Sequence, residues 1–172
     1  MRLRWCCSTT KTRSSARPEA VRRAALAGSA LAILLAACTP PSGRGIDKGA
    51  LDDAIARAIG DPSTCVLLAD RASGKVVYRY GDEIACNRTL PACDAPGLLS
   101  AQGALADALR PGGRRISCPT TADGSQMVGW AAGRLPSGKR DLVYSAVMEG
   151  QRALPGQEMA ARLSDAFANA GL

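Results

Sequence analysis

Between residues 47 and 59, apolar side chains recur at the spacing of an α-helix. Five of them occupy positions i, i+3, i+4, i+7 and i+8, namely Leu51, Ala54, Ile55, Ala58 and Ile59. The carboxylate of Asp47 can cap the first turn, and Gly60 can end the last one. This segment therefore predicts an amphipathic helix.

Two pairs of segments rich in apolar and β-branched residues each flank a short turn. Residues 64–70 (TCVLLAD) and 75–80 (KVVYRY) form the first pair. Residues 126–135 and 141–148 form the second pair, with a Pro-Ser-Gly turn at 136–138 between them. Each pair predicts a β-hairpin, because two strand-like runs around a short Gly-containing turn are typical of that unit.

The remaining patterned segments predict one more strand and two more helices. Residues 98–109 carry apolar side chains near helical spacing and stop before a Pro-Gly-Gly sequence, which predicts a helix. Residues 114–118 predict a short strand. A final helix follows Pro155 and ends near Gly171, and three large side chains share one of its faces: Met159, Leu163 and Phe167.

The order of these elements predicts an α+β fold. We expect about five strands in one antiparallel sheet, with the first and last helices covering one of its faces. The predicted domain runs from residue 47 to residue 172 as a single unit. Residues 38–46 precede it as a flexible tether, because they are rich in Pro, Ser and Gly.

The first part of the chain has the pattern of an export signal. Arg22 and Arg23 precede an uncharged run of fourteen residues, 24–37 (AALAGSALAILLAA), which is too short to span a bilayer. A positive flank, a short apolar segment and small residues before a cleavage site are typical of a secretory signal peptide. We therefore expect residues 1–37 to be removed.

The end of that signal resembles the lipobox of bacterial lipoproteins. Its four residues, Leu35, Ala36, Ala37 and Cys38, imply cleavage before Cys38 and attachment of lipid to that residue. We therefore expect a lipid-anchored protein of the cell envelope, and Thr39 resembles the residue of outer-membrane sorting if the source is Gram-negative. The alternative is a plain signal peptide that happens to contain a cysteine.

The net charge of the whole chain suggests a nucleic-acid partner, but the charge that remains after removal of the signal does not. The chain has 22 Lys and Arg against 15 Asp and Glu, a net charge of +7. Residues 1–37 carry seven of those basic residues and one of the acids, so their removal lowers the net charge to +1. We expect no nucleic-acid partner, because binding to phosphates depends on an excess of basic side chains.

The chain contains no histidine, which limits its chemistry. Ser-His-Asp and Cys-His catalysis and imidazole metal ligands are excluded. Catalysis would have to use Lys, Asp, Glu, Tyr or Cys. We expect no cofactor.

Four cysteines remain after export and lipidation. Cys6 and Cys7 leave with the signal, and Cys38 takes the lipid, so the remaining thiols are those of Cys65, Cys86, Cys93 and Cys118. Thiols in an oxidising compartment favour two disulfides. A zinc site is the alternative, but its usual Cys-x-x-Cys pairs are missing.

Several local motifs, in order, resemble the serine β-lactamase and penicillin-binding fold, and most of all class D β-lactamases. Residues 65–82 (CVLLADRASGKVVYRYGD) resemble the opening hairpin of that family, and residues 88–93 (RTLPAC) resemble the Arg-x-x-Pro-Ala-Ser approach to its nucleophile. Residues 128–133 (VGWAAG) and 142–150 (LVYSAVMEG) resemble its last hairpin, and the final helix resembles its terminal helix.

The departures from this family fall on its catalytic residues. Its nucleophilic Ser is followed three positions later by a Lys that takes the hydroxyl proton. Here those two positions hold Cys93 and Pro96, and the segment matching the family's Lys-Thr-Gly strand, residues 117–120 (SCPT), has no Lys. The family's helical insert domain has no counterpart, because only 23 residues separate Cys93 from Ser117.

Cys93 allows two interpretations, a nucleophile or half of a disulfide. Arg88 could activate its thiol, whereas Asp94 would raise the pKa of that thiol, so the disulfide is favoured. The resemblance implies the pairing. Some class D relatives bridge their first hairpin, which implies Cys65 with Cys86. Cys93 and Cys118 then match two facing positions of the family fold.

The resemblance without its catalytic residues implies a non-catalytic envelope lipoprotein that binds a peptidoglycan-type ligand or an envelope partner. One alternative is a β-lactam or D-Ala peptide hydrolase that uses Cys93 or an unidentified Ser, and others are a purely structural lipoprotein or a decayed remnant. A groove beside Cys93 lined by Arg88 and Thr120 would favour binding, whereas a groove closed by a bridge to Cys118 would favour a scaffold.

One further motif concerns anions. Arg114 and Arg115 follow Gly112 and Gly113, and together they could hold an anion. The interpretation favoured by the pattern is an ordinary, solvated start of a strand.

Overall fold

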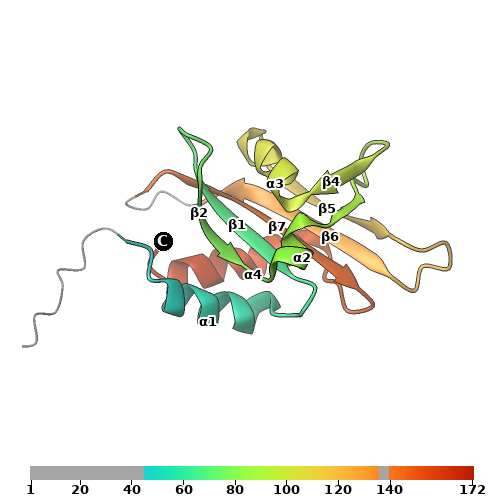
Figure 1. Cartoon of the computed structure of the whole chain (residues 1–172), viewed down its shortest axis with the longest axis horizontal. Coiled ribbons are helices and arrows are strands. Elements are labelled where there is room, and N and C mark those ends of the chain that lie inside the picture. Colours follow the sequence, from blue (N-terminus) through green and yellow to red (C-terminus); the bar gives the residue numbers. More distant parts are fainter. Residues whose placement is uncertain (1–44, 136–139) are drawn as a thin grey trace, which may run out of the picture. The chain divides into compact units, whose positions relative to one another are not determined.

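The computed structural model describes residues 45–135 and 140–172 (Figure 1). The predicted signal peptide, the predicted lipidation site Cys38, most of the tether and the turn at 136–138 lie outside the described residues. Of the helices in the described part, none has the length and apolar content needed to cross a membrane.

A five-stranded antiparallel sheet forms the centre of the described fold, with the order β2-β1-β7-β6-β5. All five strands were predicted from the sequence. Their bounds are Cys65–Asp70 for β1, Val76–Tyr80 for β2, Arg114–Pro119 for β5, Met127–Arg134 for β6 and Leu142–Gly150 for β7. The last strand, β7, therefore lies between the two hairpins and joins them into one sheet.

Two long helices, α1 (Lys48–Ile59) and α4 (Gly156–Asn169), pack against each other on one face of this sheet (Figure 1). The predicted α+β fold is confirmed, with its terminal helices on one face. Asp47 caps α1 as expected, because its side chain accepts a hydrogen bond from the Ala50 N–H at 3.1 Å. The shared apolar face of α4 is fully buried: Met159, Leu163 and Phe167.

Short elements cover the opposite face of the sheet. They are α2 (Glu83–Asn87), the two-stranded hairpin of β3 (Thr89–Pro91) and β4 (Leu98–Ser100), α3 (Ala101–Ala104) and the 3-10 helix η1 (Leu105–Leu109). A second apolar core lies beneath them, and the fully buried Trp130 of β6 is its largest side chain.

The single helix predicted for residues 98–109 is wrong. Residues 98–100 pair with β3 instead, and a helix starts only after Ser100, whose Oγ accepts a hydrogen bond from the Gly103 N–H at 3.1 Å. The α-helical turn of α3 is followed directly by the 3-10 helix η1. The apolar pattern gave the wrong prediction because two of its residues do not lie on a buried helix face: Leu98 is 67% exposed and Leu109 is 49% exposed.

Candidate functional site

The position that the resemblance matches to a nucleophile lies at the tip of the β3–β4 hairpin. A backbone hydrogen bond from the Ala92 N–H to the Gly97 carbonyl closes the tip at 3.1 Å. Cys93 has a left-handed backbone, with φ of 70°, which is uncommon for a residue with a side chain. Its sulfur is bonded to that of Cys118 on β5, and the two Cα atoms are 5.6 Å apart.

A buried arginine holds the same tip to the sheet. The side chain of Arg114, at the start of β5, is 8% exposed and donates to Asp107 Oδ2 at 2.5 Å. Its other nitrogens donate to the Ala92 carbonyl at 2.6 Å and to both oxygens of Asp94 at 2.9 and 3.0 Å. A buried charge is tolerated when it is paired and hydrogen-bonded in this way.

Trp130 adds a third attachment from beneath the hairpin. Its indole N–H donates to the Pro91 carbonyl at 2.8 Å, two residues before Cys93. We call the assembly of Cys93, Cys118, Arg114, Asp94 and Trp130 the hairpin joint. A covalent bond, an ion pair and an indole hydrogen bond thus fix the hairpin to β5 and β6.

The hairpin joint contains no group poised for acyl transfer. The Cys93 sulfur is bonded to another sulfur, so it offers no thiolate, and Arg114 already occupies the Asp94 carboxylate. The lysines in the described part of the chain are Lys48, the first residue of α1, and Lys75, which directly precedes β2, and neither belongs to the β3–β4 hairpin or to β5. Within residues 45–135 and 140–172, no three His, Cys, Asp or Glu side chains are grouped to hold a metal ion.

The second disulfide links Cys65, at the start of β1, to Cys86 in α2, with Cα atoms 5.0 Å apart. Both pairings implied by the resemblance are therefore present. Cys65 and Cys86 are buried, at 0% and 3% exposure, whereas Cys93 and Cys118 are partly exposed.

Arg88 and Thr120, the predicted groove residues, have separate surroundings. Arg88 forms an ion pair with Glu149 of β7 and lines a shallow hollow of about 440 Å³ together with Glu83, Ile84 and Asn87, of which Thr120 is not part. The Thr120 hydroxyl is buried and has no hydrogen-bond partner among the described residues. The closed bridge between Cys93 and Cys118 is the outcome expected to favour a scaffold.

The central role of Arg114 was missed in the sequence, which favoured a solvated strand start at this position. A signal was present, because alternate residues of a strand share one face. Ile116 and Cys118 pack against the second core, so Arg114 had to face inward too. Its partner Asp94 lies in a segment for which no helix or strand was predicted, and Asp107 lies in the segment wrongly predicted to be a single helix.

Comparison of the chain with protein-family models, curated proteins and solved structures found no match. The fold and the hairpin joint define an α+β domain with two disulfides, one of which closes the position matched to a nucleophile.

Proposed function

We propose that this protein is a lipid-anchored component of the bacterial cell envelope whose domain is a shortened, non-catalytic relative of class D β-lactamases and penicillin-binding proteins. It presents a rigid surface that binds a peptidoglycan-type ligand or an envelope partner. The observation that carries the non-catalytic role is the bond between Cys93 and Cys118, because it fills the position matched to the nucleophile. The binding role rests on the resemblance to the family.

The arrangement of the matched segments supports the relationship to this family. The opening hairpin, β1 and β2, and the last hairpin, β6 and β7, were matched from separate stretches of sequence. They are neighbours in one sheet, since β1 pairs with both β2 and β7. The terminal helix, α4, packs beneath that sheet (Figure 1).

The two disulfides support export. Disulfides persist in oxidising compartments and are rare in the cytosol. The segment that resembles a lipobox and the paired cysteines are independent features of the chain, and both support export from the cytosol.

Labelling with a fluorescent penicillin tests the non-catalytic role. We expect no covalent adduct on the purified protein, whether oxidised or treated with a mild reductant, because neither state supplies a base beside Cys93. An active penicillin-binding protein in the same assay provides the positive control. An adduct that is lost in the Cys93→Ala variant would overturn the proposal in favour of a hydrolase.

Co-sedimentation with purified peptidoglycan tests the binding role separately. We expect the protein to pellet with the polymer and to stay in solution without it. The closed bridge also supports a purely structural lipoprotein, and that candidate predicts no pelleting and no ligand. A protein that neither pellets nor labels would replace the binding proposal by the structural one.

A further inference from the structure

Two adjoining hollows lie at the end of the sheet where β5 begins and β6 ends. Their volumes are about 460 and 390 Å³, and both are lined by Arg115, Arg134 and Tyr144. The turn between η1 and β5, with Arg110, closes the first hollow, and Ser164 of α4 lines the second. We call the combined space the arginine pocket. Its size is typical of sites for small ligands.

All charged residues that line the arginine pocket are positive. Arg110, Arg115 and Arg134 line it, and no Asp or Glu is among its lining residues. Arg115 and Arg134 form no ion pair with any residue that the structure describes, and Arg110 shares Asp107 with the buried Arg114. Two guanidinium groups are therefore available to a ligand.

Arg115 and Arg114 are neighbours in sequence with different surroundings. Successive side chains of a strand point to opposite faces of the sheet, so Arg114 enters the hairpin joint while Arg115 faces α4. Of the two arginines that the sequence indicated as anion-binding, one is already neutralised by carboxylates and the other lines the pocket.

Tyr144 of β7 forms the floor that the two hollows share. The residue is 6% exposed, and its hydroxyl has no hydrogen-bond partner in residues 45–135 and 140–172. Burial raises the pKa of this phenol, while the positive charge of Arg115 acts in the opposite direction. Arg115 is thus close enough to influence the hydroxyl, which at neutral pH remains a hydrogen-bond donor.

We propose that the arginine pocket binds a small ligand through an oxyanion, either a phosphate or a carboxylate. The planar guanidinium group presents paired N–H donors that match both anions. Leu135, Ala160 and Phe167 give the second hollow an apolar wall against which the rest of the ligand can pack. This site goes beyond the proposed function and does not depend on it, because it includes no residue of the hairpin joint.

Nuclear magnetic resonance titration with pyrophosphate and with citrate tests the site and separates the two oxyanions. We expect at least one probe, at millimolar concentrations, to shift the amide signals of Gly112, Gly113 and Gly133, which line the pocket. The probe that binds more tightly identifies the anion. Absence of shifts with both probes, or shifts confined to other parts of the molecule, would overturn the proposal.

Two double variants distinguish specific binding in the arginine pocket from non-specific attraction of anions to surface arginines. The Arg115→Gln, Arg134→Gln variant should raise the Kd at least about tenfold, since it removes two charge-assisted hydrogen-bond donors. The matched control, Arg57→Gln with Arg79→Gln, removes the same charge from exposed arginines elsewhere and should change the Kd less than about twofold. Equal weakening in both variants would overturn the proposal.

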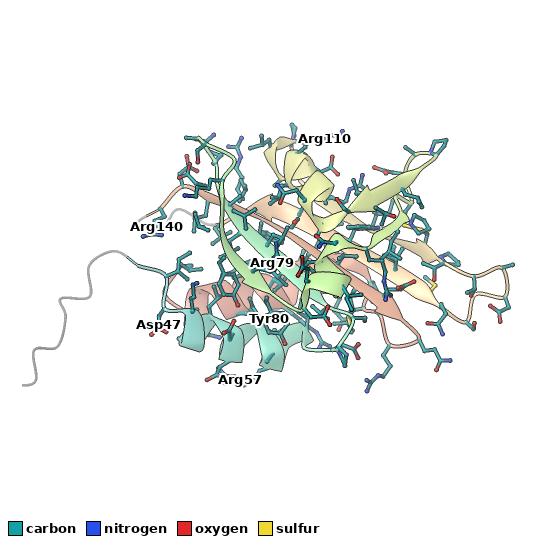
Figure 2. The ribbon with its side chains drawn as sticks, viewed as in Figure 1. Asp47, Arg57, Arg79, Tyr80, Arg110 and Arg140 are labelled. Atoms are coloured by element: carbon teal, nitrogen blue, oxygen red, sulfur yellow. A yellow bond between two sulfur atoms is a disulfide. The ribbon has the colours of Figure 1, made fainter. Side chains whose placement is uncertain are left out.

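Neither control residue lines the arginine pocket. Figure 2 shows Arg110 at the end of η1 on one side of the molecule and Arg57 on the outer side of α1 at the opposite side. Arg115 and Arg134 are themselves exposed, so their replacement should leave the fold intact, and the dispersion of the amide signals checks this in the same experiment.

Discussion

The two faces of the sheet are held together by different means. On the helix face, α1 and α4 bury a continuous apolar core that includes Tyr78 and Tyr144 and contains no disulfide. On the hairpin face, elements of three to five residues cover the second core, and all four described cysteines lie there. Helices of 12 and 14 residues bury a full apolar stripe, whereas such short elements cannot be stable by themselves.

The disulfides and the ion pairs of Arg114 therefore stabilise the hairpin face, where the short elements bury too little apolar surface to be stable by themselves. The hairpin β3–β4 contributes few apolar side chains, and its Leu98 points into solvent. It is held by the hairpin joint instead. A residue that resembles a nucleophile by sequence therefore acts, in this fold, as an attachment point.

The largest expected effect comes from removing the buried cation of the hairpin face. Arg114→Gln should lower the free energy of unfolding by about 3 to 5 kcal/mol, because the buried Asp107 would keep only the exposed Arg110 as a partner and Asp94 would lose its donor. Urea unfolding measures this change. Arg115→Gln, one residue away and exposed, is the control and should change stability by less than about 0.5 kcal/mol. Equal effects would show that Arg114 does not organise the joint.

Removal of each disulfide should have the next largest effect. The cysteines are 21 and 25 positions apart, so each crosslink should stabilise the fold by about 3 kcal/mol through the unfolded chain. The Cys65→Ala, Cys86→Ala variant should lose about 1 kcal/mol more than Cys93→Ala, Cys118→Ala, because its sulfurs are fully buried. Thermal or urea unfolding compares the two, and the reverse order would contradict the account.

A smaller effect is expected on the pH dependence of stability, through Tyr78 on the helix face. Burial, together with a hydrogen bond to the Asp52 carboxylate, raises the pKa of Tyr78 above its usual value near 10. The folded state therefore holds this proton more tightly than the unfolded state. Its contribution to stability is complete below pH about 10 and is lost as the pH rises further.

Tyr78→Phe separates this contribution from general alkaline unfolding. The variant should lose about 1 kcal/mol at neutral pH, from one hydrogen bond, and its stability should fall less steeply above pH 10 than that of the parent. Urea midpoints measured between pH 7 and 11 give both quantities. Parallel pH profiles for the two proteins would show that Tyr78 does not carry the effect.

The sequence predicted the sheet and the long helices because their periodic patterns extend over enough residues to be distinctive. No helix or strand was predicted for residues 83–97, and the single helix predicted for residues 98–109 is wrong, because a contact distant in sequence and a local cap shape these segments. Trp130, for example, holds Pro91, and Ser100 rather than a hydrophobic period determines where α3 begins. The cysteine pairing followed from the resemblance to a family and not from spacing alone.

The arginine pocket was only partly foreseeable. The sequence indicated Arg115 as a candidate for anion binding, but the contribution of Arg134 depends on the pairing of β6 with β5. Tyr144 enters from β7, whose position beside β6 is likewise a property of the sheet. Such convergence of three strands cannot be derived from local patterns.

Alkylation of the native protein, followed by peptide mapping without reduction, tests whether Cys93 is an attachment point of the hairpin and not a free nucleophile. We expect Cys93 to be linked to Cys118 and Cys65 to Cys86, and we expect iodoacetamide to modify none of these four residues. An alkylated Cys93, or Cys65 linked to Cys118, would contradict this expectation.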